Sequence, residues 1–214
     1  MSRDPRQSRG FRNRNPGNID YNARNKWQGQ VGIETTGNPP RFAVFESHEF
    51  GIRALAALLT TYQDRHGLRT IRQIVNRWAP PNENNTGSYV RFVDDFLPNH
   101  GPDDPINMHT YADARLLVEA IIRKELGGNP YSDAVLDEGL RRAGIVKPVH
   151  TVREAAATGT GRGAGAVAAA VVAAAPAAPL ISAMGALPQW TGVALIAAVA
   201  VIALVVVLSK RREA

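Results

Sequence analysis

One glutamate in this chain stands where a helix end would place a reactive carboxyl group. Glu125 lies in the run A-I-I-R-K-E-L-G-G-N-P-Y, where an apolar segment is followed by a Gly-Gly pair that predicts the end of a helix. A carboxyl group at a low-dielectric helix end beside a cleft can stay protonated near neutral pH and donate its proton. Glu125 is therefore the leading candidate for a general acid. The alternative is a solvent-facing residue before a glycine cap.

Other glutamates are candidates for roles beside it. Glu34 falls in a predicted β-hairpin, where the resemblance to lysozyme-like enzymes described below implies a second catalytic carboxylate; the common alternative is a surface residue near a turn. Glu46 and Glu49 flank the start of a predicted helix. Both are further candidates for the acid. The alternatives are that Glu49 only favours the helix dipole and that Glu46, which precedes the helix cap, only faces water.

Three motifs in residues 15–62 resemble the substrate-cleft half of lysozyme-like muramidases and glucosaminidases. They are N-P-G-N-I at 15–19, W-Q-G-Q at 27–30 and R-F-A-V-F-E-S at 41–47, and a helix follows them. The resemblance implies an Asn-rich loop, a Trp-Gly turn and a small β-lobe beside a cleft. In those enzymes the catalytic Glu precedes the Asn loop, whereas residues 1–14 here contain no Glu.

The segment around Glu125 resembles the part of lytic transglycosylases and lysozymes in which an apolar helix ends in a Glu-Ser pair before an Asn-Pro turn. Leu126 stands in place of that Ser. The resemblance implies a permuted order, with the acid helix last in the domain. Domain termini often lie close together, so a fold tolerates permutation. A permuted domain predicts that Glu125 shares a cleft with Asn18 and Glu34.

Much of residues 11–142 also resembles small phage virion proteins described as structural or lysozyme-like. The shared motifs are R-x-R-N-P-G-N-I, R-W-A-P-P-N-E-N-N-T and A-I-I-R-K-E. This resemblance implies a phage protein and does not imply catalysis. Together the two resemblances give the substrate-binding candidates Asn15, Asn18, Trp27, Glu46, Trp78 and Tyr89. The Asn side chains would bind N-acetyl groups or fix the loop backbone, and the Trp rings would stack on sugars or pack in the core.

Hydrophobic spacing and turn residues predict the elements that position these side chains. Apolar residues recur every three to four positions after Ser47 and along 107–126, which is typical of amphipathic helices. The predicted elements are a hairpin at 29–33 and 42–45 and helices at 48–62, 71–78, 88–96, 107–126 and 132–142. The predicted fold class is mainly α with a small β-lobe, a lysozyme-like domain, plus a C-terminal single-pass transmembrane helix.

Composition limits the partners. The 214 residues carry a net charge of +6, and a basic surface suits an anionic polymer such as peptidoglycan with its peptide carboxylates. Basic residues are scattered and no recognition helix is evident, which argues against nucleic acid. The chain has no Cys, which excludes disulfides, and its five His residues lack ligand spacing. We therefore expect neither a metal nor another cofactor.

The C-terminal third changes character. Residues 151–188 are rich in Ala, Gly and Pro and predict a linker. The following residues, from Trp190 to Leu208, are apolar or small and match the roughly 20 residues that cross a bilayer. This predicts a disordered basic arm at 1–10, a folded domain at 11–150, a transmembrane helix at 189–209 and a basic tail at 210–214. The protein would then be anchored in the bacterial inner membrane or a virion membrane, with the side that the domain occupies left open.

The functional prediction is a membrane-anchored phage or prophage peptidoglycan hydrolase or lytic transglycosylase. It would cleave glycan strands between N-acetylmuramic acid and N-acetylglucosamine during lysis or when the phage enters the cell. Attack by water and attack by the substrate's own 6-hydroxyl both stay open. Two alternatives are a non-catalytic virion protein that binds the wall or supports assembly, and a membrane-tethered nucleic-acid binder. Expected partners are peptidoglycan glycan strands, a lipid bilayer and other virion or lysis proteins.

Overall fold

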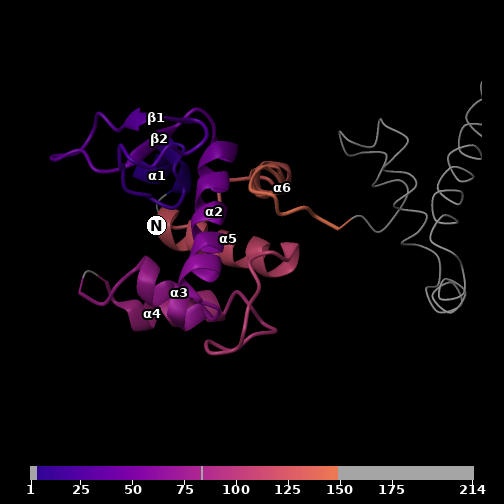
Figure 1. Ribbon diagram of the computed structural model, residues 1–214. Coiled ribbons are helices and arrows are strands. Elements are labelled where there is room, and N and C mark those ends of the chain that lie inside the picture. Colours follow the sequence, from indigo (N-terminus) through magenta and orange to yellow (C-terminus); the bar gives the residue numbers. More distant parts are fainter. Residues whose placement is uncertain (1–3, 83, 149–214) are drawn as a thin grey trace, which may run out of the picture. The chain divides into compact units, whose positions relative to one another are not determined.

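The computed structural model describes residues 4–82 and 84–148 of the chain. The chain divides into two units after Lys147, and every element described here lies in the first unit. The elements in chain order are a 3-10 helix η1 (Pro5–Gln7), α1 (Arg9–Arg12), β1 (Gln30–Ile33), β2 (Ala43–Phe45), α2 (His48–His66), α3 (Ile71–Trp78), α4 (Thr86–Asp94), α5 (Tyr111–Leu126) and α6 (Asp133–Arg142). The described part is mainly helical with one two-stranded sheet (Figure 1).

Local capping explains where the main helices begin and end. The Thr70 hydroxyl accepts from the Gln73 amide at the start of α3, and the Thr110 hydroxyl accepts from the Asp113 amide at the start of α5. Gly127, with φ of 76°, ends α5 in the left-handed conformation that favours glycine. The five predicted helices are confirmed. The predicted start at residue 107 is four residues early, because residues 107–110 form a separate turn before the Thr110 cap.

The small β-lobe is an antiparallel pair. Ile33 pairs with Ala43 and Gln30 with Phe45, and an isolated bridge joins Asp20 to Phe42. Its inward residues Ala43 and Phe45 are fully buried, whereas Val31 and Ile33 on β1 face solvent. The predicted hairpin is thus confirmed, and the bridge at Asp20 ties the Asn-rich loop to it.

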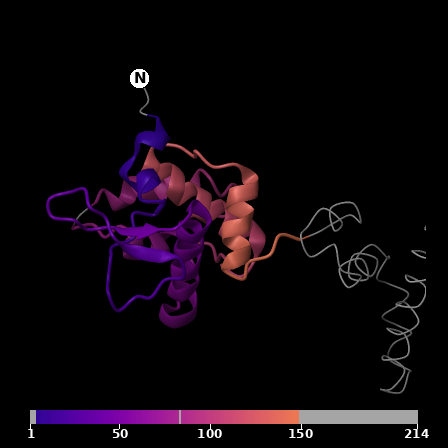
Figure 2. The ribbon, with the colours of Figure 1, turned by 90° about the horizontal axis from the view of Figure 1, so that it is seen from above.

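The two longest described helices, α2 and α5, form the centre of the described unit. Figure 1 shows β1, β2 and α1 near one end of α2, and α3 with α4 near the other. Seen from above, α5 and α6 lie beside α2 in the same body (Figure 2). The apolar stripe of α5 is buried as its spacing predicts, and Gly139 lets α6 approach Ile52 of α2 so closely that a Cβ would lie 2.4 Å from Ile52 Cγ2.

The described part of the predicted disordered arm, residues 4–10, differs from that prediction. Residues 5–12 form η1 and α1, Gly10 is buried, and the Arg9 guanidinium forms an ion pair with Glu34. Pro5 also packs against Gly128 at the end of α5. The segment is ordered because its small and basic residues find specific partners in the β-lobe and at the end of α5, which polarity alone does not indicate.

The structure corrects the transmembrane part of the predicted fold class. No helix within residues 4–82 and 84–148 is long and apolar enough to cross a membrane. The longest described helix, α2, has 19 residues but carries Glu49, Arg53 and Asp64, so it is amphipathic. The predicted span at 189–209 lies outside the described residues. Within the described residues the fold class is therefore mainly helical with a two-stranded sheet, and no described helix supports the predicted membrane anchorage.

Gly51 is the point where the Asn-rich loop lies against α2. A Cβ at this position would lie 1.9 Å from the Arg14 carbonyl oxygen and 2.9 Å from Pro16 Cδ. We expect Gly51→Ala to destabilise the protein by about 1–3 kcal/mol, because backbone must move to admit the methyl group. The matched control is Gly87→Ala in α4, whose Cβ would meet nothing closer than 4.0 Å. Urea unfolding curves measure both, and equal midpoints for the two variants would contradict this close approach.

Candidate active site

A cleft of about 510 Å³ lies where the Asn-rich loop, the β-lobe and helices α2, α3 and α5 meet. Among the described residues, its polar lining is rich in amides and includes two carboxylates: Asn18, Asp20, Asn22, Asn25, Arg41, Asn84 and Glu125. Its aromatic lining comprises Trp27, Phe42, Tyr62 and Trp78. Flat aromatic faces beside amide hydrogen-bonding groups suit a neutral, hydroxyl-rich or amide-bearing ligand.

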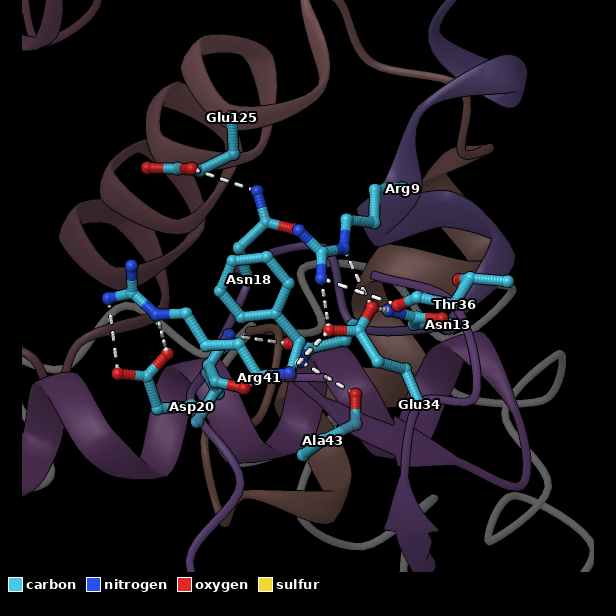
Figure 3. Close-up of polar contacts among 12 residues, drawn as sticks. Arg9, Asn13, Asn18, Asp20, Glu34, Thr36, Arg41, Ala43 and Glu125 are labelled. Atoms are coloured by element: carbon cyan, nitrogen blue, oxygen red, sulfur yellow. Dashed lines mark hydrogen bonds and ion pairs between the residues drawn. The ribbon is translucent and has the colours of Figure 1, made fainter. Parts of the chain in front are cut away.

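The Glu125 carboxylate is held by three donors from three separate elements. Asn18 Nδ2 donates to Oε2 at 3.1 Å, and Oε1 accepts from Trp78 Nε1 at 3.2 Å and from the Tyr89 hydroxyl at 2.9 Å. The contact between the Asn18 amide and Glu125 joins residues 107 positions apart (Figure 3). The predicted proximity of the Asn-rich loop and the end of α5 is confirmed by this contact.

The conformation of the Asn-rich loop places Asn18 in the cleft. Asn15 is fully buried and holds the loop by three hydrogen bonds. Its side-chain amide donates to the carbonyls of Ile19 and Ala43, and its Oδ1 accepts from the Ile19 amide. Asn18 then adopts a φ of 47°, a left-handed conformation that Asn tolerates better than most residues. Asn15, predicted to bind substrate, thus lies outside the cleft and fixes the loop, whereas Asn18 lines the cleft.

Behind Glu125, Tyr89 lies in the core on α4, only 5 % exposed. Burial and the adjacent Glu125 carboxylate raise the pKa of Tyr89 well above its usual range, so its hydroxyl remains a donor. Trp78 packs its ring against Gly17, where a Cβ would lie 3.0 Å from Trp78 Cη2. Tyr89 from the core and Trp78 from the cleft wall therefore fix the position of the carboxylate.

Glu34 occupies a different place from the one predicted. Its side chain is fully buried, it accepts from Arg9, Asn13 and the backbone amides of Arg41 and Phe42, and it is not among the described residues that line the cleft (Figure 3). Despite burial, which opposes ionisation, these donors lower the pKa of Glu34 to about 2. Glu34 is thus a fixed anion that ties α1 to the β-lobe, and its placement gives no support to a catalytic role.

Asp20 is the cleft carboxylate that sequence analysis missed. It follows the N-P-G-N-I motif directly and forms a bidentate ion pair with Arg41, with Nε to Oδ1 at 2.6 Å and Nη2 to Oδ2 at 3.2 Å. Its side chain is more than half exposed. The signal for it was its position between the Asn-rich loop and the hairpin. Tyr62, which falls at the end of the predicted helix 48–62, also lines the cleft.

The other predicted site residues divide between cleft and surface. Trp27 and Trp78 line the cleft, as their proposed ligand-stacking role requires. Tyr89 contacts Glu125 from behind the cleft wall. Glu46 is exposed at the end of β2 and is absent from the described lining. Among the residues that the structure describes, no group of three or more His, Asp or Glu side chains is arranged to hold a metal ion.

Leu126, the residue after Glu125, has a packing role. Its side chain is 4 % exposed, and its Cδ2 lies 2.7 Å from where a Cβ on Gly10 would stand. The residue after Glu125 therefore closes the contact between α5 and α1. In this chain the N-terminal segment covers the helix end, so an apolar side chain stabilises the position next to the carboxylate.

The described unit is thus a mainly helical protein with a β-lobe whose cleft centres on one glutamate held by three donors. In sequence, the chain is 35% identical over 136 residues to Protein P5 of Pseudoalteromonas phage PM2, a match that covers 62% of this chain and 79% of that protein. The chain belongs to the family of this phage protein and is therefore phage-related. No family model matches the chain.

Proposed function

We propose that this phage-related protein cleaves peptidoglycan glycan strands, with Glu125 as the general acid. The observation that carries the proposal is the position of Glu125. Its carboxyl group lies in the wall of a cleft, fixed by Asn18, Trp78 and Tyr89, with aromatic and amide side chains on the facing surfaces. Such a cleft fits hexosamine rings, which offer apolar faces for stacking and acetamido groups for hydrogen bonds.

In the proposed reaction the Glu125 carboxyl group donates its proton to the glycosidic oxygen. The bond between C1 and that oxygen breaks, and the electron pair stays on the leaving oxygen. Water, or the 6-hydroxyl of the same sugar, then forms the new bond to C1 and returns a proton to Glu125. One acid is sufficient for this sequence. The other cleft carboxylate, Asp20, is paired with Arg41.

The test is an assay of the full-length protein on purified sacculi. Turbidity loss and chromatography of soluble muropeptides measure cleavage, and mass spectrometry distinguishes a reducing end from a 1,6-anhydro end. We expect soluble muropeptides to be released. Sacculi that stay intact under conditions in which the protein sediments with them would overturn the catalytic proposal.

Wall binding without cleavage is the second candidate function. It is favoured by the pairing of Asp20 with Arg41. Of the described cleft carboxylates, this leaves Glu125, whose described donors are all neutral, and a binding cleft can have the same arrangement. The same assay separates the candidates, because co-sedimentation without released muropeptides supports binding alone.

A further inference from the structure

The donors around Glu125 are divided unequally between its two carboxylate oxygens. Oε1 accepts from both Trp78 Nε1 and the Tyr89 hydroxyl, whereas Oε2 accepts only from Asn18 Nδ2 among the described residues. Each carboxylate oxygen offers two lone pairs. The acceptor capacity of Oε1 is therefore filled, and Oε2 retains one site that can carry a proton.

Neither donor on Oε1 can easily become an acceptor. The Trp78 indole has an N–H and no lone pair for hydrogen bonding. The Tyr89 hydroxyl is buried, and Glu125 is the acceptor that the structure gives it. If the hydroxyl turned to accept from a protonated Oε1, its own proton would be left without a partner in the core, which is unfavourable. Protonation on Oε1 is thus disfavoured by both neighbours.

We infer that Trp78 and Tyr89 are positioning residues that confine the transferable proton of Glu125 to Oε2. The role of that proton in glycan cleavage rests on the proposed function, but its location does not. In the reaction the O–H bond at Oε2 breaks as the glycosidic oxygen takes the proton, and the electron pair stays on Oε2. The donors on Oε1 remain in place throughout and stabilise the carboxylate that forms.

Other titratable and charged groups near Glu125 do not change when Tyr89 is altered. Asp20, Arg41 and Tyr62 line the same cleft, from the loop, the β-lobe and α2. Lys124 is the neighbour of Glu125 on α5, and its Nζ lies 5.5 Å from the centroid of the Tyr89 ring. A Phe ring keeps this face for Lys124, so Tyr89→Phe removes the hydrogen bond of the hydroxyl to Glu125 and its interaction with Trp78, and leaves the ring in place.

The test is a carbon-13 NMR titration of glutamate side-chain carboxyl groups in the full-length protein, with the Glu125 signal assigned by its absence from Glu125→Gln. Loss of a donor to the ionised form is expected to raise the Glu125 titration midpoint in Tyr89→Phe by roughly one pH unit.

The kinetics of Tyr89→Phe give a second readout. We expect kcat to fall about tenfold with KM little changed, because Tyr89 lies behind the cleft wall and makes no part of its lining. The high-pH limb of the activity profile should move with the midpoint.

The matched control is Tyr131→Phe. Tyr131 is also largely buried, but it stacks with Phe11 and His48 and its hydroxyl has no hydrogen-bond partner within the described residues. An unchanged Glu125 midpoint in Tyr89→Phe, or an equal change in Tyr131→Phe, would overturn the assignment. If Tyr89→Phe does not fold, Trp78→Phe removes the other Oε1 donor, and the same rise in midpoint is expected. A midpoint that rises in a protein that releases no muropeptides would support the assignment and overturn the proposed function.

Discussion

Replacing Glu125 by Gln is expected to lower muropeptide release by a factor of roughly 100 to 10,000, the usual contribution of a general acid. Gln has nearly the same size and can still accept from Trp78 and Tyr89 through its carbonyl oxygen, so the fold should be retained. It has no proton that it can transfer to a glycosidic oxygen. The rate of muropeptide release and the amount of protein bound to sacculi are measured side by side.

Glu46→Gln is the matched control for this substitution. Glu46 is an exposed glutamate at the end of β2, and it is not among the described residues that line the cleft. We expect unchanged release and unchanged binding. If Glu125→Gln retained its activity, Glu125 would not be the general acid. If the variant lost both its binding to sacculi and its cooperative unfolding transition, the carboxylate would be needed for folding.

The helices and the hairpin could be predicted because each has a strong local signal. Thr70 and Thr110 cap helices whose apolar residues recur at helical spacing, and Gly127 ends the helix that carries Glu125. The proximity of Glu125 to Asn18 could also be predicted, but from motif resemblance and not from local pattern. The two residues are brought together by the packing of α5 against α1 and the loop, which no short-range rule describes.

The roles of Glu34 and Asp20 could not be predicted, because they depend on which backbone amides turn toward each carboxylate. Glu34 occupies the predicted hairpin, but it accepts from the amides of Arg41 and Phe42, just before β2, and its side chain is buried. Asp20 has no such amide partners in the described structure and extends into the cleft with Arg41. Sequence spacing gives the segment in which a carboxylate lies, whereas the tertiary fold decides which donors reach that carboxylate.

Replacing Glu34 by Gln is expected to lower the free energy of unfolding by about 3–5 kcal/mol, the usual consequence of removing one member of a buried ion pair. Oε1 accepts from Arg9 Nη2 and the amides of Arg41 and Phe42, and Oε2 accepts from Arg9 Nε and Asn13 Nδ2. In either orientation of the Gln amide, its NH₂ group would therefore face at least two other donors. Chemical unfolding at neutral pH measures the loss.

Asp103→Asn provides a matched control, because it also converts a carboxylate that is paired with an Arg guanidinium group to an amide. Asp103 pairs with Arg72 at 2.7 Å, but its side chain is 67% exposed. Exposed pairs contribute about 0–1 kcal/mol, so this variant should unfold almost like the wild type. If both variants lost a similar free energy of unfolding, burial and the backbone donors would not be the reason that Glu34 stabilises the fold.

The dependence of stability on pH gives a second, independent measure of Glu34. Its pKa is about 2 in the folded protein and 4.5 for an unperturbed Glu, so the folded state favours the ionised form. The stabilisation is fully present above about pH 4.5 and is lost as the pH falls through 2, by up to about 3 kcal/mol in total. The Gln variant has no such group to titrate. The gap in unfolding free energy between wild type and Glu34→Gln should therefore narrow between pH 4.5 and 2, and a gap that stays constant over this range would show that the Glu34 charge does not stabilise the fold.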